Sequence, residues 1–151
     1  MKILIDADAS PVRNITTELA KKYHIDLIIV CNVHHMINTD YGKVITVDSG
    51  SDVADHEIVS LTKKEDLVIT QDYGLASLIL LKGAYVLHQD GWFYTASNID
   101  TLLLQRHLSQ KMRKAKKRHG HISKRKESDN QKFKEKLEIF LKNKSFKDVS
   151  K

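Results

Sequence analysis

The 151-residue chain has little of the chemistry that marks secreted or membrane proteins. It contains one cysteine, Cys31, which excludes an internal disulfide and a zinc site built from several cysteines. No stretch approaches the ~18 consecutive apolar residues that read as a membrane span. The first residues, MKILIDADAS, lack the long apolar segment of a signal peptide. We therefore expect a cytoplasmic protein with no membrane partner, in which Cys31 is a core residue.

The length fits one domain with an appendage, and it is sufficient for a core that needs no disulfides. Hydrophobic residues make up 41% of the chain, which suits a globular protein. The character of the sequence changes after about residue 110, where basic residues dominate. We predict an α/β domain over residues 1–110 and a basic helical C-terminal extension over residues 111–151.

Charge is divided unevenly along the chain. Residues 1–105 carry 8 Lys and Arg against 14 Asp and Glu, a net charge of −6. Residues 106–151 carry 17 against 5, a net charge of +12. The net charge of +6 for the whole chain conceals this contrast between an acidic front and a basic tail. Such asymmetry favours nucleic acid, or another polyanion, as the partner.

Short apolar runs alternate with helical patterns through the first two-thirds of the chain. The predicted strands are residues 2–6, 26–31, 43–47, 66–70 and 84–87, and the predicted helices are 11–22, 53–63 and 73–82. We expect Ser10 to be the N-cap of the first helix and Pro11 its first helical residue. Strands that alternate with helices predict a mostly parallel sheet covered on both faces, which is a three-layer α/β/α fold.

A different pattern follows Gly91. Residues 92–95 (WFYT) are interpreted as an edge strand, and residues 98–117 as a long helix that is apolar at first and basic at its end. Residues 117–129 are polar and typical of a loop. Residues 130–143 form an amphipathic pattern, with Phe133, Leu137, Phe140 and Leu141 at helical spacing.

Acidic residues follow several of the predicted strands. They are Asp6 and Asp8 after the first strand, Asp48 after the third with Asp52 and Asp55 beyond it, Asp72 after the fourth, and Asp90 past the fifth. Ligands of an open parallel sheet bind outside the carboxyl ends of its strands. Converging carboxylates repel one another unless a cation lies among them, and oxygen ligands favour Mg²⁺ or Mn²⁺ over zinc. Such an ion can activate water and stabilise a phosphoryl transition state.

Each acid also has a structural alternative. Asp52 is a plausible helix N-cap with Asp55 three residues on, Asp72 can cap the helix that begins at Tyr73, and Asp90-Gly91 is a turn signal. Asp6 closes a buried strand and has no capping role. The joint pattern favours function, because capping alone does not require Asp at the ends of three strands.

Four motifs in order carry a family resemblance: IDADASPV, VDSGSDVADHEIV, TQDYGLA and DGWFYTASNI. With them the chain resembles the YaiI/YqxD family of bacterial proteins, which are PIN-like. The resemblance implies a PIN-like fold in which Asp6, Asp55 and Asp72 are the metal-binding and catalytic acids and Thr70 supports Asp72. Asp8, Asp48 and Asp52 belong to the same motifs and are further candidate ligands. Ser10 stands where the family commonly has Cys.

Other residues are candidates for contact with substrate. Ser49 lies in a turn before a helix, where backbone N–H groups can bind phosphate, although a bare turn explains it equally well. Arg13 lies near the predicted site and can pair with a carboxylate or reach a phosphate. The run from Lys111 to Arg118, which includes Lys114 and Lys117, supplies phosphate contacts without sequence readout. Trp92, Phe93 and Tyr94 can stack on bases or pack in the core.

Three functions remain open from the sequence. The first is a Mg²⁺- or Mn²⁺-dependent nuclease that acts on RNA or DNA, with RNA the favoured substrate class. The second is a nucleic-acid-binding protein without turnover. The third is a phosphatase with an aspartyl-phosphate intermediate, in which Asp6 is the nucleophile and Asp8 the general acid. That chemistry needs a further acidic pair after a later strand, where only Asp90 is found. The oligomeric state stays open, with a homodimer among the alternatives.

Overall fold

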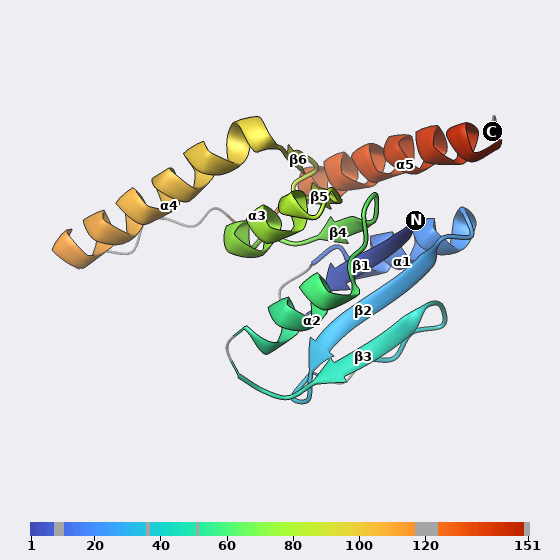
Figure 1. The fold of residues 1–151 in the computed structure, drawn as a ribbon, viewed down its shortest axis with the longest axis horizontal. Helices are drawn as coiled ribbons and strands as arrows, with labels where there is room; N and C mark the ends of the chain where they lie inside the picture. The colour runs from blue at the N-terminus through green and yellow to red at the C-terminus, as the bar shows by residue number, and fades with distance from the viewer. Residues whose placement is uncertain (8–10, 36, 51, 117–123, 150–151) are drawn as a thin grey trace.

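The fold is a six-stranded sheet with helices on both faces (Figure 1). The computed structural model describes residues 1–7, 11–35, 37–50, 52–116 and 124–149. The strands are β1 (Lys2–Asp6), β2 (Asp26–Asn32), β3 (Lys43–Val47), β4 (Leu67–Ile69), β5 (Tyr85–Leu87) and β6 (Phe93–Tyr94). The helices are α1 (Arg13–Lys22), α2 (Val53–Leu61), α3 (Tyr73–Leu81), α4 (Ala96–Lys116) and α5 (Glu127–Val149).

The strand order is β3-β2-β1-β4-β5-β6, and every pair is parallel except β5–β6. The predicted strand at residues 92–95 is therefore an antiparallel edge strand, as expected. The chain leaves β1 toward β2 and later returns to its other side as β4. The strand order thus reverses between β1 and β4, and this is where ligands bind in open α/β sheets.

Side chains alternate between two cores along the strands. Ile3 and Ile5 of β1 are fully buried in the core that α1 and α5 complete. Leu4 is buried on the opposite face, in the core that α2, α3 and the start of α4 complete. Strands buried on both faces are continuous apolar runs, which is the pattern that the sequence displays. The predicted three-layer α/β/α architecture with a mostly parallel sheet is confirmed.

Helix α5 packs into the core although its sequence is strongly charged. Phe133, Leu137 and Leu141 are fully buried at helical spacing among residues of β1, β2 and β4. The turn before β6 meets the backbone of α5 so closely that a Cβ on Gly91, whose φ is +86°, would lie 2.8 Å from the carbonyl carbon of Lys132. Helix α5 is thus part of the packed structure, and the predicted division after residue 110 stays a prediction.

The start of α1 differs from the expectation. The helix begins at Arg13, and Pro11 lies in the preceding turn rather than at the first helical position. Val12 is the N-cap residue and forms no side-chain cap. Its side chain is fully buried, and its carbonyl accepts hydrogen bonds from both the backbone N–H and the hydroxyl of Thr16. Burial of Val12 fixes where the helix starts, and the expected cap Ser10 lies outside the described residues.

The sequence predicts no membrane-spanning segment, and the helices of the described segments can be compared with that expectation. None of them combines the length and the apolar character that a membrane span requires.

Candidate functional site

Two carboxyl groups meet at the carboxyl edge of the sheet. Asp55 lies in the first turn of α2 and is half-buried, and Asp72 lies at the N-cap of α3. The charge of Asp72 acts on the carboxyl of Asp55. Burial raises the pKa of Asp55, and the negative charges of Asp72 and Asp52 raise it further. The pair therefore favours whatever neutralises it, a proton or a cation.

Local hydrogen bonds fix the position of Asp72. Its Oδ1 accepts a hydrogen bond from the backbone N–H of Leu75 at 3.1 Å, so the predicted cap of α3 is present. The backbone N–H of Asp72 donates to Oγ1 of Thr70 at 3.0 Å, and Thr70 is buried. The Thr-Gln-Asp sequence after β4 thus holds one carboxylate in a defined orientation at the edge of the sheet.

Asp6 ends β1, between β2 and β4. The side-chain alternation places it on the same face as Leu4, two residues earlier, and this is the face that α2 and α3 cover. Asp6 therefore shares both an edge and a face with Asp55 and Asp72. Within the described ranges, however, no three Asp, Glu, His or Cys side chains are grouped so that they could hold a metal ion. The interacting pair in this geometry is Asp55 with Asp72.

The donor chemistry of this pair fits a hard divalent cation. Mg²⁺ is commonly held by one or two carboxylates while its remaining positions are taken by water and substrate phosphates. Asp55 and Asp72 supply two carboxylates that repel each other in the absence of a positive charge. A set of three protein ligands is not needed for such a site.

The other predicted acids lie beside this pair or outside the described residues. Asp48, Ser49 and Asp52 are exposed in the turn between β3 and α2. Asp52 is the N-cap residue of α2, with φ at 69°, but its side chain accepts no cap hydrogen bond. Its measurable role is electrostatic, since its charge acts on Asp55. Asp8, Lys117 and Arg118 lie outside the described residues, as does the side chain of Lys114 in α4.

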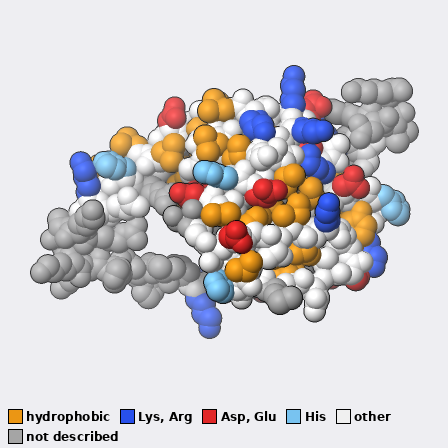
Figure 2. Space-filling view, turned by 60° about the horizontal axis from the view of Figure 1, so that its bottom comes forward, with side chains coloured by type: hydrophobic (Ala, Val, Ile, Leu, Met, Phe, Trp, Pro, Cys, Tyr) orange, Lys and Arg blue, Asp and Glu red, His pale blue; other side chains and the backbone are white. Residues whose placement is uncertain are grey.

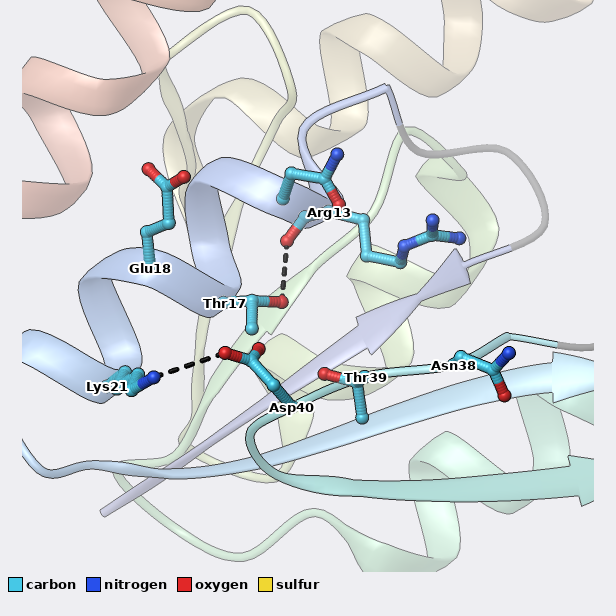
Figure 3. Close-up of a pocket in the computed structure, with 8 residues that line it drawn as sticks. Arg13, Thr17, Glu18, Lys21, Asn38, Thr39 and Asp40 are labelled. Atoms are coloured by element: carbon cyan, nitrogen blue, oxygen red, sulfur yellow. Dashed lines mark hydrogen bonds and ion pairs between the residues drawn. The ribbon is translucent and has the colours of Figure 1, made fainter.

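Arg13 lines a pocket of about 260 Å³ between α1 and the segment that joins β2 to β3. Asn38, Thr39 and Asp40 form the wall opposite α1, and Lys21 bridges the two walls through an ion pair of 3.1 Å with Asp40 (Figure 3). This pocket lies on the α1 face of the sheet, whereas Asp55 and Asp72 lie on the α2–α3 face. Arg13 thus belongs to the helix that packs on the opposite face of the sheet from α2 and α3, and its part in binding substrate stays a prediction.

Sequence reasoning overlooked two aromatic neighbours of the acid pair, Tyr73 and His88. Tyr73 directly follows Asp72, and His88 directly follows β5. Their rings join those of Trp92 and Tyr94 in one group. The signal that could have found them was position, because both residues follow a strand at its carboxyl end. On the face drawn in Figure 2, several acidic side chains lie near the centre among hydrophobic ones.

Comparison with known proteins places the chain among bacterial relatives. A UPF0178 protein of Natranaerobius thermophilus is 49% identical over 146 residues, which are 96% of this chain and 99% of that protein. A UPF0178 protein of Alkaliphilus oremlandii is 49% identical over 133 residues, which are 88% of this chain and 86% of that protein. Among solved structures, the W164L mutant of Rae1 (YacP) from Bacillus subtilis aligns with 95% of this chain and 99% of its own. That alignment has a TM-score of 0.43 at 16% sequence identity.

The family assignment agrees with the motifs quoted from the sequence. Residues 4–143 match the family described as "Uncharacterized BCR, YaiI/YqxD family", a range that includes all six strands from Leu4 of β1 onward and most of α5. The chain belongs to the YaiI/YqxD family.

Proposed function

We propose that the protein is a metal-dependent nuclease that hydrolyses RNA at the carboxyl edge of its sheet. The observation that carries the proposal is the placement of Asp55 in the first turn of α2 and of Asp72 at the N-cap of α3, both at the carboxyl ends of the strands, where the strand order reverses. Two repelling carboxylates at this position have no evident structural purpose beyond the cap that Asp72 provides. They suit a Mg²⁺ or Mn²⁺ ion that also contacts a phosphate.

Each residue has a defined part in this proposal. Asp55 and Asp72 hold the cation, and Asp6 lies on the same face and edge to bind it directly or through water. When bound, the ion would lower the pKa of a water molecule and offset charge on the phosphate. Thr70 and the N–H of Leu75 keep Asp72 oriented. In the net reaction, water oxygen bonds to phosphorus, one P–O ester bond breaks, and the leaving oxygen gains a proton.

The test is cleavage of labelled single-stranded RNA in Mn²⁺ by the wild type and by two variants, Asp55→Asn and Asp72→Asn. Asparagine can still accept the hydrogen bond that caps α3, so Asp72→Asn should leave the fold intact. We expect each variant to lose about 10²- to 10³-fold in rate, the loss typical of one group that stabilises transition-state charge. Asp26→Asn, an exposed acid at the other edge of the sheet, is the matched control. Cleavage that survives both substitutions contradicts the proposal.

A second candidate is a nucleic-acid-binding protein that does not cleave. The basic residues after residue 105 suit either function, because phosphate contacts supply affinity without sequence readout. This candidate predicts RNA binding that weakens steeply with salt, together with no cleavage in Mg²⁺ or Mn²⁺.

A further inference from the structure

Four aromatic rings gather where the start of α3 meets the β5–β6 hairpin. Tyr73, the first residue of α3, meets Tyr94 of β6 edge-on, with ring centroids 5.7 Å apart. The Tyr94 ring also contacts Trp92 at 4.6 Å and His88 at 5.9 Å. His88 stacks on Trp92 with centroids 4.4 Å apart and an interplanar angle of 11°. This ring cluster (Tyr73, His88, Trp92 and Tyr94) begins one residue after Asp72.

The ring cluster has an inner and an outer layer. His88 and Tyr94 are buried, with relative exposures of 8% and 2%. Trp92 and Tyr73 are partly exposed and form the rim. Phe93, which lies between Trp92 and Tyr94, packs instead on the opposite face of the sheet, 5.3 Å from Phe140 of α5. Trp92 and Tyr73 pack against the core with one part of their surface and leave another part accessible.

The hairpin that carries the rim is rigid. The backbone N–H of His88 donates to the carbonyl of Trp92 at 2.8 Å, and the N–H of Asp90 donates to Nδ1 of His88 at 3.0 Å. The imidazole proton is therefore on Nε2, and the ring is neutral, since burial lowers the pKa of His88. Arg125 reaches from the segment before α5 and donates to Asp90 Oδ1 at 2.8 Å and to the carbonyl of Gln89 at 2.7 Å.

We propose that Trp92 and Tyr73 form a stacking subsite for a nucleobase of single-stranded RNA whose phosphate lies at Asp55 and Asp72. The inference rests on the proposed function, because the acid pair defines where the phosphate lies. Aromatic rings held rigidly beside a phosphate site bind bases of any sequence, since every base has a π-face. Pre-positioned rings also avoid the entropy cost of ordering side chains on binding. The subsite would thus select unpaired RNA without reading its sequence.

Trp92 is the only tryptophan in the chain, so its fluorescence reports on the subsite directly. The experiment titrates the wild-type protein in Ca²⁺, a divalent cation that oxygen ligands also hold, with an end-labelled oligoribonucleotide. It follows both the anisotropy of the label and the tryptophan emission. The matched control is an abasic oligomer of equal length, which keeps the phosphates and removes the bases. We expect both oligomers to bind, and only the one with bases to quench Trp92 in proportion to occupancy. Binding without quenching, or equal quenching by the abasic oligomer, overturns the subsite.

Substitutions give a second readout. Trp92→Leu should weaken binding of the base-containing oligomer by roughly 5- to 150-fold, the range expected for loss of one stacked base. Trp92→Phe keeps a ring and should recover most of that affinity. Phe93→Leu changes the neighbouring aromatic on the other face and should leave the affinity unchanged. An unchanged affinity in Trp92→Leu contradicts the subsite, as does an equal loss of affinity for the abasic oligomer.

The two proposals fail in different ways. Quenching by the base-containing oligomer without cleavage in Mn²⁺ would sustain the subsite and overturn the nuclease. Cleavage that is indifferent to Trp92→Leu, with no quenching in Ca²⁺, would sustain the nuclease and overturn the subsite. If neither oligomer binds, the subsite is overturned as well.

Discussion

Aspartate residues have opposite environments at the two ends of the parallel strands. The side of the sheet where the strands begin is its amino edge, and the side where they end is its carboxyl edge. At the amino edge, Asp66 before β4 is buried, and its carboxylate accepts hydrogen bonds from the backbone N–H groups of Lys2 at 3.0 Å and Lys63 at 2.8 Å. It also forms an ion pair with the Lys2 side chain. At the carboxyl edge, the charge that acts most strongly on Asp55 is that of another carboxylate, Asp72.

The pKa values move in opposite directions as a result. Burial tends to raise the pKa of Asp66. The hydrogen bonds and charge of Lys2, together with the backbone hydrogen bond from Lys63, outweigh burial and lower that pKa. Burial raises the pKa of Asp55, and its acidic neighbours add to that effect. At the amino edge, groups of the protein itself therefore stabilise the charged form of Asp66. At the carboxyl edge, the charged forms of Asp55 and Asp72 repel each other, and a cation would stabilise them.

The largest effect should come from breaking the amino edge. Asp66→Ala leaves the partly buried Lys2 ammonium unpaired and removes the acceptor for two backbone N–H groups. We expect the free energy of unfolding to fall by about 3–5 kcal/mol, as for other buried pairs that lose one partner. Urea unfolding measures it. Asp26→Ala, at an exposed position on the same edge, should change it by no more than about 0.5 kcal/mol.

The same contribution should depend on pH in a defined direction. The pKa of Asp66 is lowered from its ordinary value of 3.8, so the unfolded chain binds the proton more readily than the folded one. The stabilisation is therefore complete above pH 3.8 and is lost as the pH falls through the lower, folded-state pKa. Wild type and Asp66→Ala, unfolded in urea over a pH series, should converge in acid. A gap that stays constant down to strongly acidic pH contradicts the assignment.

At the carboxyl edge a cation should stabilise the fold. A ligand that binds only the folded state adds about 2.7 kcal/mol at a concentration 100 times its Kd. We expect Mn²⁺ to raise the melting temperature of the wild type and of Asp66→Ala, but not that of Asp55→Asn. The measurement is thermal unfolding with and without EDTA. An equal Mn²⁺ shift in all three proteins would place the cation elsewhere.

Without a cation, removing an acidic charge should change the free energy of unfolding in opposite directions at the two edges: it should fall at Asp66 and rise at Asp55. Asp55→Asn removes one of two repelling charges, so in EDTA at neutral pH it should raise the free energy of unfolding by about 1 kcal/mol, a gain typical of charge optimisation. Urea unfolding in EDTA checks this, with Asp26→Asn as the control for the substitution itself. A loss of stability in Asp55→Asn would mean that the carboxylate has a structural role like that of Asp66.

The layers of the fold could be predicted from the sequence, but the tertiary contacts within it could not. A strand such as Leu27 to Cys31 can be predicted from the sequence because both faces of the sheet are buried, which makes the strand a continuous apolar run. The start of α1 was misplaced because burial of Val12, a tertiary effect, overrides the local signal of Ser10-Pro11. Local chemistry predicts where a helix can start, and packing decides where it does.

The sequence predicted which acidic residues belong to the candidate site, but not which of them interact with one another. Strand ends pointed to Asp6 and Asp72, because the carboxyl edge follows from a parallel sheet alone. The interaction of Asp55 with Asp72 depends on α2 packing beside α3, which no local pattern encodes. The partner of Asp90 was equally hidden, since Arg125 is 35 residues away and arrives only because α5 docks on the core.

Asp90 offers the smallest and most discriminating effect. It lies past β5 at the same edge as the acid pair, but its carboxylate binds Arg125 at 2.8 Å and is 47% exposed. Asp90→Asn should lower the free energy of unfolding by less than about 1 kcal/mol, as is usual for exposed ion pairs. Because Asp90 already has a cationic partner, its loss should leave the Mn²⁺ shift of the melting temperature intact. If Asp90→Asn abolished that shift, position at the carboxyl edge, and not the mutual interaction of Asp55 and Asp72, would be what makes an acid a ligand.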